Sequence, residues 1–402
     1  MKNHTRTWGR LAVIGTIVTV GTLLTGCASS ASSSSGSGST AVTEIPIGAS
    51  VEVTGGAGSI GSIWKQGIDL AIKQANGKSG FTVAGKKYKW QLTLDDNQTT
   101  TDQAIANYRS FVGNNDNFII GPGVSTEFPP AINSLGGKQP IILTPAQGTA
   151  FIGTPAGQNL YLTHLSDTGA KGRVAQMVGL LMKKYHPKTV AILLPQDASG
   201  ELYTTTYGQA FKDAGAKIVY SEAFPSTTTD FSSYVTAIKA TNPSLVVSGY
   251  LDSWMQPFMN QASQAGLTSP VFVGAPGTNV TSMQDHAGIT KFAYSVTTRA
   301  VDNASDPKVA SYRKVYEAEY GTEPSATGFW ALSYYDPILM LTQAMKDAKT
   351  VSDLSAITKS FVKIKDFGTL GETFDPTTHR AVYNAQVGFS DNGKVSYVDA
   401  GN

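Results

Sequence analysis

The chain has 402 residues, of which 31 are Lys or Arg and 29 are Asp or Glu, so its formal charge is nearly neutral at +2. This balance, without clusters of basic residues, excludes the electrostatic footprint of a nucleic-acid-binding protein. The length is sufficient for two domains of ordinary size.

The first 26 residues have the pattern of an export signal. Lys2, Arg6 and Arg10 give a basic start, and residues 11–24 follow as an uncharged, mostly apolar run of 14 residues. This order is typical of the charged n-region and apolar h-region of a signal peptide. An uncleaved membrane anchor is the alternative, but spanning a bilayer takes roughly 20 residues. We therefore expect residues 1–26 to be a signal peptide.

The segment that follows predicts a lipid anchor on a tether. Leu24-Thr25-Gly26-Cys27 resembles the lipobox of bacterial lipoproteins, in which the cysteine is lipidated and becomes the first residue of the mature chain. Cys27 is the only cysteine, so it cannot form an internal disulfide. Residues 27–43 are rich in Ser, Gly and Ala and have too little apolar surface to fold, which indicates a flexible tether. We expect an extracytoplasmic protein that is anchored to the cell membrane by a lipid on Cys27.

Strand and helix patterns alternate through the rest of the chain. A first helix is indicated by apolar residues at the spacing i, i+3, i+4, i+7, and a later one ends near Gly215 as a candidate cap. Alternation of this kind predicts parallel sheets with helices on both faces, and two such series predict two doubly wound lobes. Ligands of such sheets bind beyond the carboxyl ends of the strands. The strands are expected at 45–53, 89–94, 118–120 and 141–143, and, in a second series that begins near His164, at 190–194, 218–220, 245–248 and 271–273.

The sequence contains only weak matches to the motifs of enzymes. Residues 56–61 match G-x-G-x-x-G between a strand and a helix, as in a dinucleotide site. The acidic residue that should follow about 20 residues later is absent, because Asp95 lies 34 residues beyond Gly61. An exported domain is also separated from cytoplasmic NAD. We interpret this segment as a tight turn that lines a cleft, and we predict no catalytic residues, no metal and no cofactor, since the histidines lack metal-ligand spacing and no G-x-S-x-G elbow occurs.

Short segments along nearly the whole chain after residue 44 resemble the leucine/isoleucine/valine-type periplasmic binding proteins, the type I substrate-binding proteins of ABC transporters. The resemblance implies an α/β fold of two doubly wound, Rossmann-like lobes joined by three hinge crossings. It places lobe one at 44–163 and 297–373 and lobe two at 164–296 and 374–402. The segments that carry it are Thr54-Gly55, Gly61, Gly67–Ala71, Asp95-Asp96, Gly121–Thr126, Thr144–Ala146, Thr229–Phe231, Asn242-Pro243, Ala265–Leu267, Tyr320-Gly321, Tyr335-Asp336 and Gly368–Asp375.

The resemblance also implies a function. A monomer would capture an amino acid, or a related small carboxylate or amide, between its lobes and deliver it to an ABC permease. Contacts of the solute to both lobes would favour the closed state, and no bond would be broken. Two alternatives remain: a ligand-binding receptor that serves a separate sensor, and an exported NAD-dependent enzyme.

On lobe one, the resemblance implies solute contacts in two loops. Ser125 falls where the family places a serine hydroxyl on the ligand's carboxylate, and we expect a helix that starts there to offer free N–H groups to an anion. Capping of that helix is the alternative role for Ser125. Thr126 is a neighbouring candidate. The next loop contributes Ala146, Gln147 and Gly148, where Gly148 stands in place of the threonine of amino-acid binders and Thr149 is a substitute.

On lobe two, Tyr203 and Tyr250 match cleft positions of the family, although both could be packed aromatic residues. Trp64 and Trp254 are weaker candidates. The acid that pairs with the ligand's ammonium in branched-chain amino-acid binders is replaced by Pro276. A buried ammonium without a carboxylate is costly. Either the solute therefore lacks an ammonium, or another acid substitutes for the missing one, the candidates being Asp252, Glu127 and Asp197.

Overall fold

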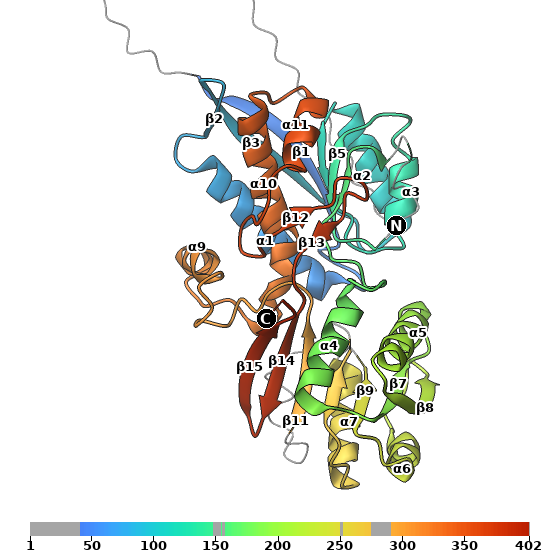
Figure 1. Cartoon of the computed structure of the whole chain (residues 1–402). Coiled ribbons are helices and arrows are strands. Elements are labelled where there is room, and N and C mark those ends of the chain that lie inside the picture. Colours follow the sequence, from blue (N-terminus) through green and yellow to red (C-terminus); the bar gives the residue numbers. More distant parts are fainter. Residues whose placement is uncertain (1–40, 148–153, 155–156, 250–251, 275–290, 402) are drawn as a thin grey trace, which may run out of the picture. The chain divides into compact units, whose positions relative to one another are not determined.

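The computed structural model describes residues 41–147, 154, 157–249, 252–274 and 291–401, without the side chains of residues 198, 252 and 253. The expected signal peptide, most of the tether and Cys27 lie outside these residues. Among the described helices, none combines the length and the apolar character that a membrane crossing requires. The chain folds as two α/β lobes, each built around one large sheet (Figure 1).

Lobe one is built on a six-stranded sheet. Its strands β3, β1, β4, β5 and β6 are parallel neighbours, and β2 pairs antiparallel with β3 at one edge. In sheet order the strands are β2 (Phe81–Val83), β3 (Lys86–Asp96), β1 (Thr43–Val51), β4 (Phe118–Ile120), β5 (Ile141–Thr144) and β6 (Leu160–Leu162).

Lobe two is built on a seven-stranded sheet. Parallel pairing runs from β8 through β7, β9 and β10 to β11, and two antiparallel strands complete the sheet. In sheet order the strands are β15 (Lys394–Asp399), β14 (Gln386–Asp391), β11 (Lys291–Val296), β10 (Val271–Val273), β9 (Leu245–Ser248), β7 (Thr189–Pro195) and β8 (Lys217–Phe224).

The expected parallel sheets are present, and antiparallel strands that the alternation did not indicate extend them at their edges. β2 and β3 are joined by a two-residue turn at Ala84-Gly85, and β14 and β15 by another at Asn392-Gly393, with positive φ at all four residues. Such turns return the chain directly alongside the preceding strand, so pairing there must be antiparallel. The Asn-Gly pair in particular is a strong hairpin signal.

Helices cover the sheets with their apolar stripes. The stripe expected on the first helix is confirmed, because Ile68, Ala71 and Ile72 are buried in α1. Gly215, with φ of +88°, follows Ala214, the C-cap residue of α5, at the position where a left-handed residue commonly ends a helix. The helices of lobe one are α1 (Gly58–Asn76), α2 (Thr101–Gly113), α3 (Phe128–Asn133), α9 (Ala310–Tyr320), the 3₁₀ helix η2 (Ala326–Ala331), α10 (Leu332–Ala348) and α11 (Leu354–Phe361). Of these, α9, η2 and α10 pack on α1.

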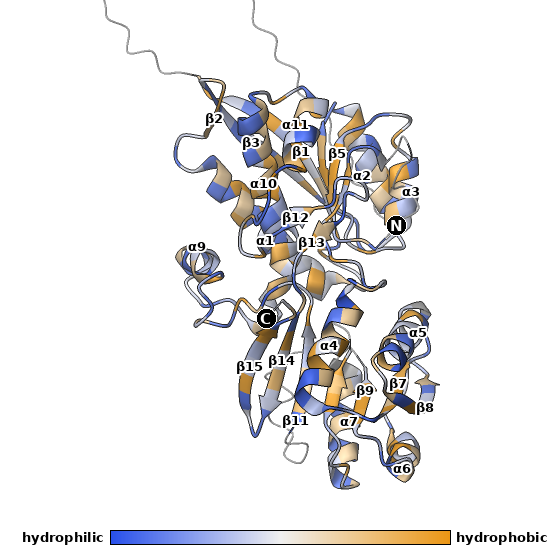
Figure 2. Ribbon diagram, in the orientation of Figure 1, coloured by the Kyte–Doolittle hydropathy of each residue, from blue (hydrophilic) through white to orange (hydrophobic). Residues whose placement is uncertain are grey.

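The helices of lobe two are α4 (Arg173–Tyr185), α5 (Ala198–Asp213), α6 (Ser232–Ala240) and α7 (Asp252–Gln264). The interior of each lobe is apolar. Strands β5, β9 and β10 are buried along their whole length, and Figure 2 shows hydrophobic colours along β5 and β9. Continuous apolar runs of this kind are typical of parallel strands that have both faces covered.

Three segments connect the two large sheets, and the hydroxyl group of one tyrosine links these segments by hydrogen bonds. Tyr383 lies after β13 (Ala381–Val382), which pairs with β12 (Thr373–Phe374) in a small separate sheet. The Tyr383 hydroxyl accepts a hydrogen bond from the Leu165 N–H at 3.1 Å and donates to the Thr297 carbonyl at 3.2 Å. The crossings that follow β6, β11 and β13 therefore meet at one buried side chain. The lobe boundaries proposed above remain a prediction.

Candidate functional site

A cavity of about 190 Å³ has walls from both lobes. It lies beyond the carboxyl ends of β4, β5 and β6, where the doubly wound fold places ligands. Lobe one and η2 contribute Ile60, Trp64, Gly123, Val124, Ser125, Pro145, Gln147 and Trp330, and the crossings and lobe two contribute His164, Asp167, Arg173, Tyr203 and Thr297.

The loop after β4 presents Ser125 from a turn and not from a helix start. Helix α3 begins at Phe128, after Glu127 as its cap residue, and its second and third positions are prolines. Proline has no N–H, so this first turn has few donors for an anion. The expected helix at Ser125 is therefore wrong, and so is the alternative that Ser125 caps it. Ser125 is exposed.

The loop after β5 is joined to the loop after β4. The Thr144 hydroxyl donates to the Pro122 carbonyl at 2.5 Å and accepts from the Ala146 N–H at 3.0 Å. The Gln147 main-chain N–H donates to Ser125 Oγ at 2.9 Å. These bonds hold Ser125 and Gln147 side by side on one wall of the cavity.

Behind this wall lies a buried pair of acids. Glu52 Oε1 accepts the N–H groups of Gly123 and Val124 at 2.9 and 3.0 Å. Burial, with the nearby Glu52 carboxylate as a second cause, raises the pKa of Glu127 to about 8. Glu127 is thus mainly protonated at neutral pH and is not one of the residues that line the cavity.

On the lobe-two wall, Arg173 and Asp167 form a buried ion pair. The Arg173 guanidinium contacts Asp167 Oδ1 at 2.6 Å, and the exposed fractions of the two side chains are 2% and 8%. Arg173 also donates to Ser295 Oγ at 2.6 Å and to the Tyr203 hydroxyl at 3.0 Å. Tyr203 in turn donates to Asp167 Oδ2 at 3.1 Å. The charge of Asp167 is therefore compensated within the protein.

A second arginine supports the cavity from the position just before β13, the strand that leads into the third crossing. Arg380 Nη1 donates to Gln147 Oε1 at 3.0 Å and to the His164 carbonyl at 3.3 Å. Arg380 is 7% exposed and makes no ion pair with any described residue. Burial, together with the charges of Arg173 and Arg380, lowers the pKa of His164 to about 3, so this imidazole is neutral. Its Nε2 lies 2.6 Å from Ser333 Oγ.

Aromatic rings form much of the remaining wall. The Trp64 and Trp330 rings lie edge to face with centroids 6.0 Å apart, and the His164 ring is 5.5 Å from Trp330. Gly123 is required by this packing, because a Cβ there would lie 2.3 Å from the Trp64 ring. Within the described part of the chain, neither indole N–H has a hydrogen-bond partner.

The predicted residues divide into three groups. Ser125, Gln147, Tyr203 and Trp64 line the cavity, whereas Thr126 and Ala146 do not. Trp254 donates to the Ser226 carbonyl and packs on Phe224 in the core of lobe two. Asp197 caps α5 by accepting the Gly200 N–H at 2.7 Å. Outside the described residues lie Gly148, Thr149, Tyr250 and Pro276, and the Asp252 side chain is not described.

Sequence reasoning missed His164, Asp167, Arg173, Thr297, Trp330 and Arg380. Asp167 and Arg173 lie in a polar, glycine-containing segment between β6 and α4, and that composition was the available signal. The G-x-G-x-x-G segment has a structural explanation: a Cβ on Gly61 would lie 1.7 Å from the Glu52 carbonyl oxygen. This glycine lets α1 approach the end of β1 closely.

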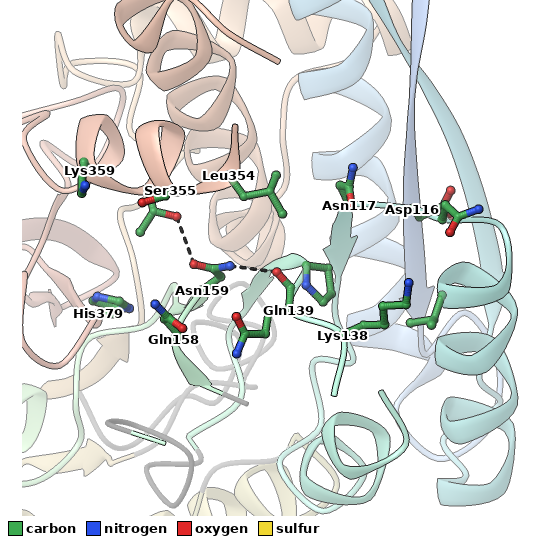
Figure 3. A pocket seen from close by; sticks show the side chains of 14 residues that line it. Asp116, Asn117, Lys138, Gln139, Gln158, Asn159, Leu354, Ser355, Lys359 and His379 are labelled. Carbon is green, nitrogen blue, oxygen red and sulfur yellow. Dashed lines mark hydrogen bonds between the residues drawn. The ribbon is translucent and has the colours of Figure 1, made fainter. Parts of the chain in front are cut away.

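A larger cavity, of about 550 Å³, lies at the opposite ends of the strands of lobe one (Figure 3). Its lining includes Asn117, Pro140 and Asn159, which directly precede β4, β5 and β6. Asn159 bridges its rim, since its amide group donates to the Gln139 carbonyl and accepts from Thr358. Its lining residues surround this one sheet, and His379, from the segment before β13, joins them through a contact of its ring with the Leu160 carbonyl of β6. The sheet of lobe two contributes none of the described lining residues. Groups of three or more His, Cys, Asp or Glu with metal-binding geometry do not occur among the described residues.

Comparison with known proteins agrees with this architecture. Residues 44–394 match the family model described as periplasmic binding protein. The chain is 26% identical over 311 residues to the leucine-, isoleucine-, valine-, threonine- and alanine-binding protein of Pseudomonas aeruginosa, an alignment that covers 77% of this chain and 80% of that protein. The Leu/Ile/Val-binding protein of Escherichia coli K12 is 26% identical over 222 residues, or 55% of this chain and 58% of that protein.

Solved structures share the fold. The branched-chain amino-acid transporter substrate-binding protein of Streptococcus pneumoniae in complex with isoleucine superposes with a TM-score of 0.69 at 21% identity, covering 89% of this chain and 100% of that one. A solute-binding protein of an ABC transporter from Rhodopseudomonas palustris, in complex with benzoate, gives 0.68 at 16% identity, covering 89% and 96%. At these identities the likeness establishes the fold alone.

Proposed function

Because the chain belongs to the periplasmic binding protein family, whose members bind solutes and are not enzymes, we propose that it is the solute-binding lipoprotein of an ABC importer. It captures an amino acid, or a related small carboxylate or amide, between its two lobes and delivers it to the permease. A lipid on Cys27 holds it at the outer face of the cell membrane.

The observation that carries this proposal is the composition of the smaller cavity. Ser125 and Gln147 come from loops of lobe one, whereas Asp167, Arg173 and Tyr203 come from the first crossing and lobe two. A solute that contacts both sets is bound best when the lobes are closed, so binding shifts the population toward the closed state. The Tyr383 hydroxyl, which joins the crossings, gives that motion a common pivot.

A cavity between two lobes is sufficient for solute capture, and no bond of the solute needs to be broken. The cavity holds one small solute, since 190 Å³ corresponds to about six water molecules at roughly 30 Å³ each. The bound solute stabilises the closed form of the lobes. A permease would recognise that closed form. The tether at residues 27–43 would keep the protein within reach of such a partner.

The test is calorimetry on the full-length protein with a library of amino acids, small carboxylates and amides. We expect at least one solute to bind with one-to-one stoichiometry, and Ser125→Ala to weaken it about tenfold, as for a lost hydrogen bond to a charged group. Ser110→Ala is the matched control, because Ser110 is exposed on α2 and its hydroxyl makes no hydrogen bond to another described residue. Equal affinity in both variants would place the site elsewhere.

A further inference from the structure

We propose that the solute of this pocket is a carboxylate without an ammonium group, either a branched aliphatic or an aromatic monocarboxylate. The inference rests on the proposed function, because it names the chemical class of the solute at the same site. The supporting observation is that hydrogen bonds within the protein already use many of the acceptors of the pocket and leave donors available to a solute.

On the lobe-one wall, the free polar groups are donors. Ser125 Oγ already accepts the Gln147 N–H, which leaves its hydroxyl proton free to be donated. The Gln147 side chain turns its oxygen to Arg380, and this orientation is chemically fixed because a guanidinium has donors only. The free end of that amide is therefore its NH₂ group. Both groups can donate to an anion, and the Gln147 NH₂ group also opposes an ammonium because it has no acceptor.

The two tryptophans that line the pocket offer no acceptor to an ammonium. Trp64 and Trp330 are 4% and 8% exposed, and their buried indole N–H groups have no partner in the described part of the chain. An indole nitrogen donates but does not accept. An ammonium, which brings only donors, would therefore find no hydrogen-bond partner on either side chain.

Among the described residues, the acids near the pocket already have partners or are neutral. Both oxygens of Asp167 are bonded, one to Arg173 and the other to the Tyr203 hydroxyl. Asp197 caps a helix, and Glu127 lies behind the wall, where its raised pKa of about 8 keeps it mainly neutral. An ammonium that approached Asp167 would also approach the positive charges of Arg173 and Arg380, both of which are buried.

The remaining wall suits an apolar body. The Trp64, Trp330 and Tyr203 side chains line the cavity together with Ile60, Val124 and Pro145. Aromatic faces and aliphatic groups in these positions would cover a short branched chain or a single ring, while the donors hold its carboxylate.

The experiment compares solutes that share a skeleton and differ only in charge. Calorimetry on the full-length protein would use L-leucine, 4-methylpentanoate and 3-methylbutylamine as one set, and L-phenylalanine, 3-phenylpropanoate and 2-phenylethylamine as a second. We expect a carboxylate without an amine to bind at least tenfold more tightly than the amino acid of its set, with no binding of the amine. Tighter binding of an amino acid would overturn this inference while leaving the proposed function intact. If neither the carboxylates nor the amino acids bind, the proposed function fails as well.

A variant tests the donor polarity directly. Gln147→Glu keeps the size of the side chain and its contact with Arg380 but replaces an NH₂ donor with a carboxylate oxygen. We expect the affinity for the carboxylate to fall about 100-fold, because two like charges would meet in the pocket. Gln158→Glu, in the larger cavity of lobe one, makes the same change of charge and should leave the affinity unchanged. Unchanged affinity in Gln147→Glu would contradict the proposal.

Discussion

Arg380 donates a hydrogen bond from Nη1 to Oε1 of Gln147 at 3.0 Å, although the two residues are 233 positions apart in the chain. Arg380 directly precedes β13 and the third crossing, and Gln147 lies in the loop after β5. A residue next to a crossing thus fixes the orientation of a side chain on the pocket wall. We therefore expect this contact to influence solute affinity.

The first prediction concerns that contact. Arg380→Met removes the buried guanidinium and frees the Gln147 amide to rotate. We expect solute affinity to fall about tenfold, as for the loss of one oriented hydrogen bond, measured by calorimetry. Stability should change little, because the lost hydrogen bonds are offset by removal of a buried charge that forms no ion pair with the residues the structure describes. Unaltered affinity would indicate that Arg380 does not position Gln147.

The ion pair of Arg173 and Asp167 should be essential for stability. Asp167→Asn leaves a buried guanidinium without its carboxylate, and breaking such a pair costs about 3–5 kcal/mol. Urea denaturation would measure the free energy of unfolding. Glu323→Gln is the matched control, since Glu323 also pairs with a buried arginine, Arg313, but its own side chain is 76% exposed. That variant should lose less than about 1 kcal/mol.

Glu127 should make stability depend on pH. Its pKa is raised from 4.5 to about 8 in the folded state, so between these values the folded protein retains a proton that the unfolded chain has lost. The free energy of unfolding should therefore fall as pH rises from about 5 to about 8 and then level off, by an amount on the order of a few kcal/mol.

Glu127→Gln should flatten this dependence and make the protein more stable than the wild type at pH 8. Urea denaturation at several pH values, with Glu323→Gln as the control, would reveal it. A Glu127→Gln profile that follows the wild-type profile through the same window would show that Glu127 is ionised in the folded protein.

Gly123 should be intolerant of a side chain. Gly123→Ala places a Cβ 2.3 Å from the Trp64 ring, which must then leave its position on the pocket wall. We expect at least a tenfold loss of solute affinity. Gly179→Ala is the comparison, because nothing lies within 4 Å of its Cβ and it sits inside α4. That variant should bind normally and gain about 0.5–1 kcal/mol of stability.

The lipid anchor should be separable from solute binding. Cys27→Ser removes the only thiol of the chain and thus the proposed lipidation site. We expect the protein to leave the membrane fraction while its calorimetric affinity stays the same. Loss of binding in the released protein would mean that tether and body are not independent modules.

Much of the fold was predictable because its signals are local. Apolar runs identified β4, β5, β9 and β10, and the apolar stripe identified α1. The hairpins at the sheet edges were missed although Asn392-Gly393 is a strong turn signal. Ser125 was expected at a helix start, but the prolines at 129 and 130 belong to a helix that begins later.

The site was only partly predictable, for a physical reason. Ser125 and Gln147 follow strands of a parallel sheet, so the general rule for ligand position finds them. Arg173, Trp330 and Arg380 reach the same place through tertiary contacts of segments far apart in the sequence. Their burial and hydrogen bonds have no local pattern, and the occupied state of Asp167 becomes visible only when its partners are in place.

The central claim is that the cavity between the lobes holds the solute. The most direct test is native mass spectrometry of the full-length protein, purified without denaturation and supplied with the solute that calorimetry identifies. We predict one bound solute per wild-type chain, the same for Gln158→Glu, and none for Gln147→Glu. Loss of the solute from Gln158→Glu but not from Gln147→Glu would contradict the account, because it would place the solute in the outer cavity of lobe one.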